Sequence, residues 1–321
     1  MRGSLMKLCT KEQHLRVLKL HPTDNTAAAE LYTDLMGKAV GSSNVAYWRR
    51  IFVTEGTQGK ADQAIMQERK LRVPQPDDDI GILPDLDAVY HCILHIPDQH
   101  APYGHPDTIR FLQAVKDAFP IDIVVNAGDE TDYHGLSFHD ADPNLDSAGV
   151  ELEKAKVQLS RLHDLFPEQL VCNSNHGSMV FRKAKHHGIP VQMLKKYRDV
   201  LFPEHGAPHW SWAEQWMLDT PLGPVLFRHQ SSNPVSDAAH ERCNVMVGHN
   251  HSKFSVEYCA SKDFLYWGAT GGCLVDNKSY AYAYGKVFTK KPIIGCTVIL
   301  EGRPMLIPMV LDKAGNWIGK L

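Results

Sequence analysis

From residue 89 onward, short apolar runs alternate with segments that carry one apolar stripe. The runs 89–96, 121–127 and 169–175 are predicted to be buried strands, because each is short and is bounded by polar or turn residues. The segments between them, 105–119 and 147–166, have the helical spacing of apolar positions. An order of strand, helix, strand, helix, strand predicts parallel strands joined by right-handed crossovers, and therefore an α/β fold.

The pattern becomes strand-rich after residue 210. Apolar runs separated by turn residues predict further strands, several of them paired as antiparallel hairpins. These runs are 213–220, 224–230, 244–248, 254–259, 264–270 and 292–300. A chain of this length allows one large domain with a small appendage.

The N-terminal part of the chain has a different pattern, which predicts three short helices. Gly37 is a natural end for the second of them, and a short turn precedes the third. The arrangement resembles a helix-turn-helix unit with Trp48, Arg49 and Arg50 on or near its third helix. The alternative is a helical cap that packs on the main domain and touches no nucleic acid; spacing alone does not separate the two.

The following stretch lacks a periodic apolar pattern and contains several glycines and prolines ahead of an acidic run. These features are typical of a linker. The sequence therefore predicts a helical, helix-turn-helix-like region over 1–55, a linker over 56–88 and the large domain over 89–321.

Composition narrows the class of protein. The chain has 321 residues, of which 43% are hydrophobic and 22% charged, and its net charge is −3. Any contact with nucleic acid must therefore depend on a local basic patch. No apolar stretch approaches the ~20 residues that span a bilayer, so we expect no membrane partner. The seven cysteines form no CxxC pair, which favours free thiols and a cytoplasmic location.

Polar residues with metal-binding or acid–base chemistry follow the predicted strands at the point where each strand ends. In an open α/β sheet, ligands gather beyond the carboxyl ends of the strands. The residues at these ends are Asp98, His100, Asp129, Asp132, Asn175, His176, His229, His249 and His251. Five such strand ends would rarely coincide by chance.

The donor atoms of this set suit divalent cations. Carboxylate and amide oxygens together with imidazole nitrogens favour Mn, Fe or Zn, and Mg is a further alternative. The set is larger than one octahedral ion needs, but it suits two ions that share a bridging carboxylate. We therefore predict two divalent metal ions, with Mn as the first choice.

The spacing within the motifs adds a prediction about the backbone. In an extended segment, alternate residues face the same side. Asp98 and His100 would then face one way, and so would His249 and His251. Gly248 is predicted to let the backbone come close to the site.

The motifs in order are DQH at 98–100, GDETD at 128–132, NSNH at 173–176, His229 and GHNH at 248–251. This series resembles the pattern DxH, GDxxD, GNH, H and GHxH of the calcineurin-like metallophosphoesterase superfamily, over roughly residues 89–321. The longer stretches around the later motifs are similar to phosphoesterases encoded by tailed bacteriophages. The resemblance implies an αββα sandwich, to which the small N-terminal helical region would be added.

The resemblance implies two sets of metal ligands that share one bridging carboxylate. The first set would be Asp98, His100 and His251. The second set would be Asn175, His229 and His249, and the bridge would be Asp129.

The resemblance also implies a general acid: His176 would protonate the leaving oxygen, oriented by Asp132. Ser174 and Gly177 replace the usual residues of the third motif. Tyr133 stands where protein serine/threonine phosphatases carry an arginine that grips the phosphate. A dianionic monoester gains more from such an arginine than a monoanionic diester does, so the sequence favours diesters.

The sequence thus predicts a metal-dependent phosphoric ester hydrolase, and more specifically a phosphodiesterase that cleaves nucleic acid as a nuclease. Its location would be the cytoplasm, that of the host if a bacteriophage encodes the chain. The alternative is a phosphatase or phosphodiesterase that acts on small nucleotides or phosphoproteins. A non-enzymatic scaffold is disfavoured, because a decayed site usually loses a ligand first.

Overall fold

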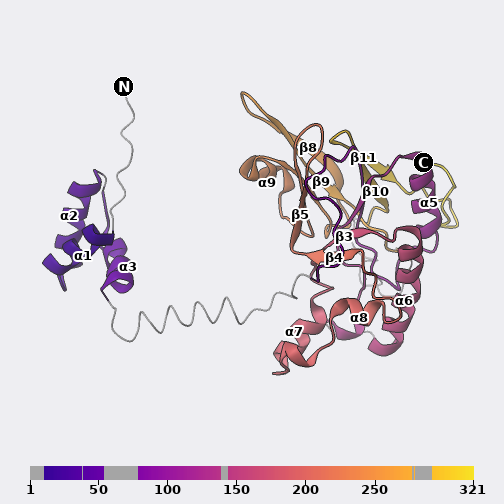
Figure 1. Cartoon of the computed structure of the whole chain (residues 1–321), viewed down its shortest axis with the longest axis horizontal. Coiled ribbons are helices and arrows are strands. Elements are labelled where there is room, and N and C mark those ends of the chain that lie inside the picture. Colours follow the sequence, from indigo (N-terminus) through magenta and orange to yellow (C-terminus); the bar gives the residue numbers. More distant parts are fainter. Residues whose placement is uncertain (1–10, 38, 54–78, 139–143, 277, 279–290) are drawn as a thin grey trace. The chain divides into compact units, whose positions relative to one another are not determined.

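The chain forms two compact units, residues 1–74 and 75–321. The computed structural model describes residues 11–37, 39–53, 79–138, 144–276, 278 and 291–321 (Figure 1). Most of the linker predicted over 56–88 lies outside the described residues. Its last part, from Asp79 onward, belongs to the second unit, where the main-chain oxygen of Asp79 accepts a hydrogen bond from the main-chain nitrogen of Trp212.

The described residues of the first unit form three helices, which confirm the predicted N-terminal helical region. They are α1 Lys11–Leu20, α2 Asn25–Met36 and α3 Ser42–Phe52. α2 ends at Gly37, whose φ of 67° is the left-handed conformation that glycine adopts readily. Leu18 and Tyr32 are fully buried in the small core that the three helices share.

Arg49 on α3 is engaged within the helical unit. Its guanidinium donates a hydrogen bond of 2.9 Å to the side-chain oxygen of Asn25 and further bonds to main-chain oxygens of the turn between α1 and α2. Trp48 packs against the core of the same unit. Both side chains therefore help to hold α3 in place, while the side chain of Arg50 lies outside the described residues. Contact of this unit with nucleic acid stays a prediction.

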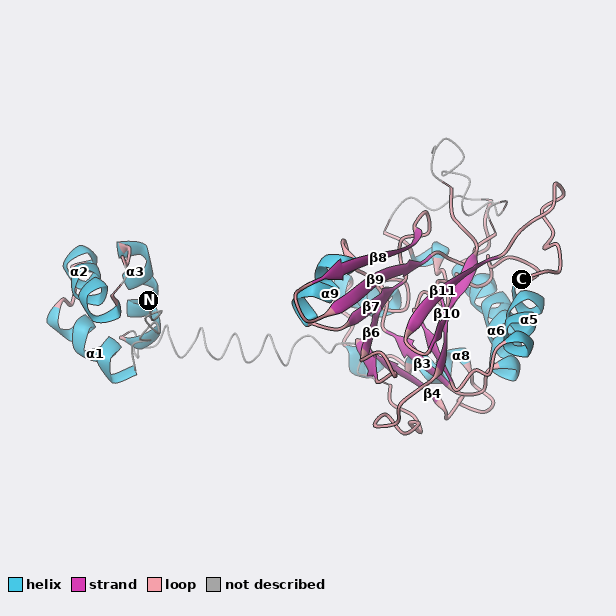
Figure 2. Cartoon of the chain, turned by 90° about the horizontal axis from the view of Figure 1, so that it is seen from above, coloured by secondary structure: helices cyan, strands magenta, loops and turns pink. Residues whose placement is uncertain are grey.

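Two sheets form the centre of the second unit (Figure 2). The six-stranded sheet has the order β11-β10-β1-β2-β3-β4 and the five-stranded sheet the order β5-β6-β7-β9-β8. The strands of the first sheet are β1 Cys92–Ile96, β2 Ile123–Asn126, β3 Gln169–Cys172, β4 Trp210–Ala213, β10 Gly295–Leu300 and β11 Arg303–Pro308. The strands of the second are β5 Gln215–Leu218, β6 Val225–Arg228, β7 Asn244–Val247, β8 Phe254–Ala260 and β9 Leu265–Gly271.

Helices cover the outer faces of both sheets. α5 and α6 lie beside the first sheet and α9 beside the second (Figure 2). The helices of this unit are α5 Thr108–Ala118, α6 Ala148–Leu165, α7 Met179–His186, α8 Tyr197–Leu201 and α9 Pro234–Glu241, with 3-10 turns η1 His134–Leu136 and η2 Val191–Met193. Among the described residues, no helix combines the length and the apolar character needed to cross a membrane.

The alternation of side chains along β1 explains the layers. Leu94 and Ile96 pack with Phe111 of α5, whereas Ile93 points the other way and packs with Phe227 of the second sheet. The central strands of each sheet are thus buried on both faces, one against helices and one against the other sheet. The order of helix, sheet, sheet and helix confirms the αββα sandwich that the sequence predicts.

The pairing of strands agrees with the prediction in the first sheet and differs in part of the second. β1, β2, β3 and β4 are parallel to one another, whereas β10 pairs antiparallel with β1 and with β11. β4 is a strand that the sequence pattern does not reveal. β5–β6 and β8–β9 are antiparallel hairpins, as predicted. β6 and β7 are parallel because α9 forms a crossover between them. β7 and β9 are also parallel, and β8, which is antiparallel to β9, lies between them in the chain.

His95 is a buried imidazole inside this sandwich and gives the fold a dependence on pH. Burial lowers its pKa from 6.5 to about 4, and the nearby Asp98 only partly opposes this. Between these pH values the unfolded chain binds a proton that the folded chain does not. Above pH 6.5 His95 therefore does not reduce the free energy of unfolding, and this free energy falls as the pH drops from 6.5 towards 4.

We expect His95→Leu to weaken this acid sensitivity. A shift of this size corresponds to roughly 3 kcal/mol in the free energy of unfolding between the two pH limits. Urea unfolding of metal-free protein at a series of pH values measures the effect, with His91→Leu, an exposed histidine before the same strand, as the control. Identical pH slopes for the two variants would contradict the assignment.

Candidate metal centre

The predicted ligands lie on loops that follow five strands of the two sheets. β1, β2 and β3 are parallel, as are β6 and β7, so the carboxyl ends of each group lie at one end of its sheet. The fold brings these two ends together. The residues delivered there are Asp98, His100, Asp129, Asn175, His229, His249 and His251.

One cluster contains Asp98, His100 and His251. Nε2 of His251 lies 3.1 Å from Oδ2 of Asp98 and 3.1 Å from Nε2 of His100. Asp98 is fully buried, and its Oδ1 has no hydrogen-bond partner. A buried carboxylate oxygen without a partner is costly unless a cation lies next to it. The donor atoms of this cluster therefore fit a divalent ion.

A second cluster contains Asp129, His229 and His249, with Asn175 beside it. Nε2 of His229 lies 3.3 Å from Oδ2 of Asp129, 3.2 Å from Nδ1 of His249 and 2.7 Å from Oδ1 of Asn175. The other nitrogen of His229 is 2.9 Å from the main-chain oxygen of Ala127. Such a bond fixes Nδ1 as the protonated nitrogen and leaves Nε2 for a metal.

Asp129 connects the two clusters. Its Oδ2 lies 3.5 Å from Nε2 of His100 on one side and 3.3 Å from Nε2 of His229 on the other. Its Oδ1 accepts a hydrogen bond of 3.0 Å from the main-chain nitrogen of His176. One carboxylate oxygen is thus within reach of both histidine groups, which is the position that a bridging ligand needs.

The backbone at three of these ligands differs from the extended conformation that the sequence predicts. The segments around His100 and His249 are not extended: φ is 49° at His100 and 65° at His249, and it is 48° at Asp129. Each lies in the left-handed region, which costs a residue other than glycine on the order of 1–3 kcal/mol. The side chains therefore converge because the chain turns sharply at each ligand, and not because of strand alternation.

Gly248 gives the backbone the close approach that the sequence predicts. A Cβ atom on Gly248 would lie 2.3 Å from Oδ1 of Asp98 and 2.8 Å from Cβ of Ala127. Both neighbours are buried, so neither can move away easily. Position 248, where the fifth motif packs against Asp98 of the first motif, therefore has no room for a residue larger than glycine.

Gly248→Ala is expected to reduce the free energy of unfolding by about 1–3 kcal/mol and to weaken metal binding, because it displaces Asp98. Urea unfolding and titration with Mn²⁺ measure the two effects. Gly149→Ala is the control, since a Cβ there meets no atom within 4 Å. A variant at Gly248 that matches wild type in both measurements would show that the loop has more room than its geometry indicates.

Asp132 has a different partner from the one that the resemblance implies. Its Oδ1 lies 2.6 Å from Nδ1 of His100 but 3.9 Å from Nδ1 of His176. Nδ1 of His176 instead donates to the main-chain oxygen of Asp132. The carboxylate thus orients a candidate metal ligand, and the main chain of the same residue orients His176.

The charges of the second cluster depend strongly on one another. Burial opposes ionisation of Asp129, yet the combined attraction by His229, His100 and His176 outweighs it and holds the pKa of Asp129 well below its ordinary value. Burial likewise lowers the pKa of His229, but Asp129 dominates and raises it to about 9. His229 therefore carries a proton at neutral pH in the metal-free protein, and this proton must leave when a cation binds.

Glu130 lies within the second motif but points away from the centre. Its Oε1 accepts a hydrogen bond of 2.8 Å from Nε1 of Trp212 on β4, and burial raises the pKa of its carboxyl group. Sequence spacing gives no sign of this partner, because β4 itself is not predicted. This hydrogen bond attaches the loop between β2 and the candidate centre to β4 of the sheet.

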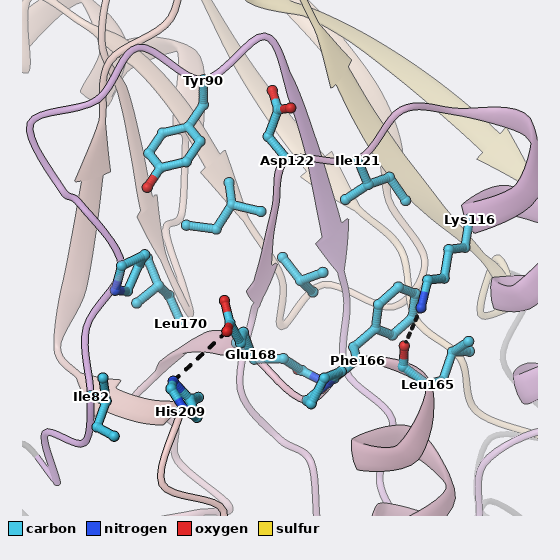
Figure 3. A pocket seen from close by; sticks show the side chains of 15 residues that line it. Ile82, Tyr90, Lys116, Ile121, Asp122, Leu165, Phe166, Glu168, Leu170 and His209 are labelled. Carbon is cyan, nitrogen blue, oxygen red and sulfur yellow. Dashed lines mark hydrogen bonds and ion pairs between the residues drawn. The ribbon is translucent and has the colours of Figure 1, made fainter.

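A cavity at the opposite ends of the strands is separate from this centre. It has a volume of about 370 Å³ and lies where β2 and β3 begin. Figure 3 shows Lys116 donating to the main chain of Leu165, and His209 facing Glu168. Nδ1 of His209 and Oε1 of Glu168 are 3.8 Å apart. None of its lining residues is one of the predicted site residues.

Comparison with known proteins adds weak likenesses. No family model matches the chain, and no curated protein matches it. Among solved structures, vacuolar protein sorting 29 from Cryptosporidium parvum is 11% identical, with a TM-score of 0.37 over 68% of this chain and 87% of that one. An archaeal phosphodiesterase is 13% identical, with a TM-score of 0.35 over 68% and 99%. The NAD nucleotidase of Haemophilus influenzae is 8% identical, with a TM-score of 0.33 over 71% and 53%. At these scores the likenesses carry no argument about activity.

Proposed function

We propose that this protein is a metal-dependent phosphoesterase that uses two divalent cations, Mn²⁺ first among them, to hydrolyse phosphodiester bonds of nucleic acid. The observation that carries the proposal is the position of Asp129, whose Oδ2 lies within 3.5 Å of one histidine group and 3.3 Å of the other. Two cations that share a ligand are suited to phosphoryl displacement.

Each cation would have its own ligands in addition to the shared Asp129. The ligands of one would be Asp98, His100 and His251, and those of the other Asn175, His229 and His249. When bound, such cations polarise a phosphoryl oxygen and generate a nucleophile from water at neutral pH. The protein contributes the fixed placement of the ligands, with Asp132 holding His100 and the main chain holding His229.

His176 is the proposed proton donor to the leaving oxygen. Its main-chain nitrogen donates a hydrogen bond to Oδ1 of the shared Asp129, which places the backbone of His176 next to the centre. Its Nδ1 is engaged by the main chain of Asp132, which leaves Nε2 to exchange a proton. The side chain is 24% exposed, which supports access to a substrate.

Tyr133 supports a diester substrate over a monoester. The residue is buried and its ring faces Tyr197, with centroids 6.3 Å apart. It therefore supplies no cation at the position where an arginine would grip a dianionic phosphate. A bacteriophage origin and a cytoplasmic location are also proposals, and they rest on the sequence alone.

A substrate panel tests the proposal. Metal-free protein is reloaded with Mn²⁺, Mg²⁺ or Zn²⁺ and incubated with single- and double-stranded DNA, RNA, bis(p-nitrophenyl) phosphate, p-nitrophenyl phosphate, cyclic nucleotides and a phosphopeptide. Cleavage of the polynucleotides and of the small diester supports it. Hydrolysis confined to monoesters or small nucleotides would favour the alternative phosphatase or nucleotide phosphodiesterase, and failure to bind any cation would favour a scaffold.

A further inference from the structure

α7, the helix that follows the third motif, carries a group of cations beside the candidate centre. Arg182 and Lys185 are exposed on it, and Lys183 is half-buried. The stretch 179–198 contains lysines and arginines but no aspartate or glutamate, although the whole chain has a net charge of −3. Positive charge is therefore concentrated on this part of the domain.

An aromatic ring holds two of these cations. The guanidinium carbon of Arg182 lies 5.1 Å and Nζ of Lys183 lies 4.5 Å from the centroid of Phe138, a residue that follows η1. An aromatic ring has no net charge, so it does not cancel the positive charge of a cation above it as a paired carboxylate does. Phe138 is itself 46% exposed, so this group of side chains faces solvent.

A cavity joins Arg182 of α7 to the candidate centre. It has a volume of about 380 Å³, and its lining includes Asn175 and His229 together with Arg182 and Arg228. Nη1 of Arg182 lies 3.4 Å from the main-chain oxygen of Asn175. Nε of Arg228 is buried there without a hydrogen-bond partner. Nη2 of Arg228 pairs with Asp237, and Glu214 also lines the cavity. A chain of anionic groups that leaves the centre by this route therefore meets the guanidinium group of Arg182 as its main cation.

We propose that Phe138, Arg182, Lys183 and Lys185, here called the α7 cation surface, bind the phosphates of a nucleic-acid strand on one side of the scissile bond. The inference rests on the proposed function and names the polymer contact that this function needs. Lysine and arginine that neutralise phosphates release counterions, so binding weakens as salt rises. A small diester has no flanking phosphates and gains nothing from this surface.

The double variant Lys183→Gln/Lys185→Gln tests the inference in the full-length chain loaded with Mn²⁺. The value of kcat/KM is measured over a series of NaCl concentrations for a single-stranded oligonucleotide and for bis(p-nitrophenyl) phosphate. On single strands each phosphate contact contributes about 0.7 to the slope of log kcat/KM against log salt, so the slope should become less steep by about 1.4. At low salt, the oligonucleotide should lose about tenfold more than the small diester does.

The matched control is Lys313→Gln/Lys320→Gln, which removes the same charge from two exposed lysines near the C-terminus. Figure 1 places this end of the chain and α7 at opposite sides of the domain. Equal slopes for the two double variants overturn the inference and leave the proposed function standing. A wild-type protein that hydrolyses the small diester and no polynucleotide overturns both the inference and the nuclease proposal, and one that hydrolyses neither overturns the phosphodiesterase proposal itself.

Discussion

Asp129→Asn is expected to reduce kcat/KM for a phosphodiester by about 10³-fold, because a metal site contributes several kcal/mol to the transition state and each 1.36 kcal/mol is tenfold in rate. The asparagine keeps the shape of the side chain but removes the negative charge between the two histidine groups. Oδ2 of Asp129 lies near both Nε2 of His100 and Nε2 of His229. We therefore also expect fewer than two cations to remain bound after dialysis.

Plasma emission spectrometry and steady-state kinetics on the same preparation measure these two effects. Asp263→Asn is the matched control, since it makes the same chemical change at an exposed position outside the site. Two tightly bound cations in Asp129→Asn, together with activity close to that of wild type, would remove Asp129 from the role of shared ligand.

His176→Gln is expected to lower kcat by about 10²–10⁴-fold, the usual contribution of general acid–base catalysis. Unlike Asp129→Asn, this change should leave both cations in place, because the bond from residue 176 to Asp129 comes from the main chain. The loss should depend on the leaving group. A diester that releases p-nitrophenolate needs little help from an acid, whereas one that releases an alkyl alcohol needs a proton.

The measurement compares kcat for these two kinds of diester in wild type, His176→Gln and the control His91→Gln. His91 is exposed at the other end of β1, where it pairs with Glu301. An equal loss for both leaving groups would mean that His176 acts by placing Asp129 rather than by donating a proton.

The strands that deliver the site could be predicted because their signals are local. Each is a short apolar run closed by polar or turn residues, and its position follows from the chain nearby. β4 has no such signal: Trp210–Ala213 is recognisable as a strand only through its pairing with β3 and the bond from the Trp210 indole to the main-chain oxygen of Phe166. A short window of sequence does not reveal long-range contacts of this kind.

The chemistry of the site could be predicted from residue types, whereas its local geometry could not. The left-handed backbone at His100 and His249 depends on the surroundings of each loop, since neither residue favours it by itself. The partner of Asp132 is a second example. The resemblance implies His176 as this partner, whereas the folded loops place the carboxylate 2.6 Å from His100 and 3.9 Å from His176.

The division of the ligands between the two sheets has a mechanical consequence. Asp98 and Asp129 belong to loops of the first sheet, whereas His229 and His251 belong to loops of the second. A cation bound by ligands from both sheets would cross-link the two sheets at this end of the sandwich, as a disulfide cross-links two segments of a chain. Separation of the two sheets during unfolding would then require release of the ion. The metal-loaded protein should therefore have a higher melting temperature than the metal-free protein, and the difference should grow with the free cation concentration.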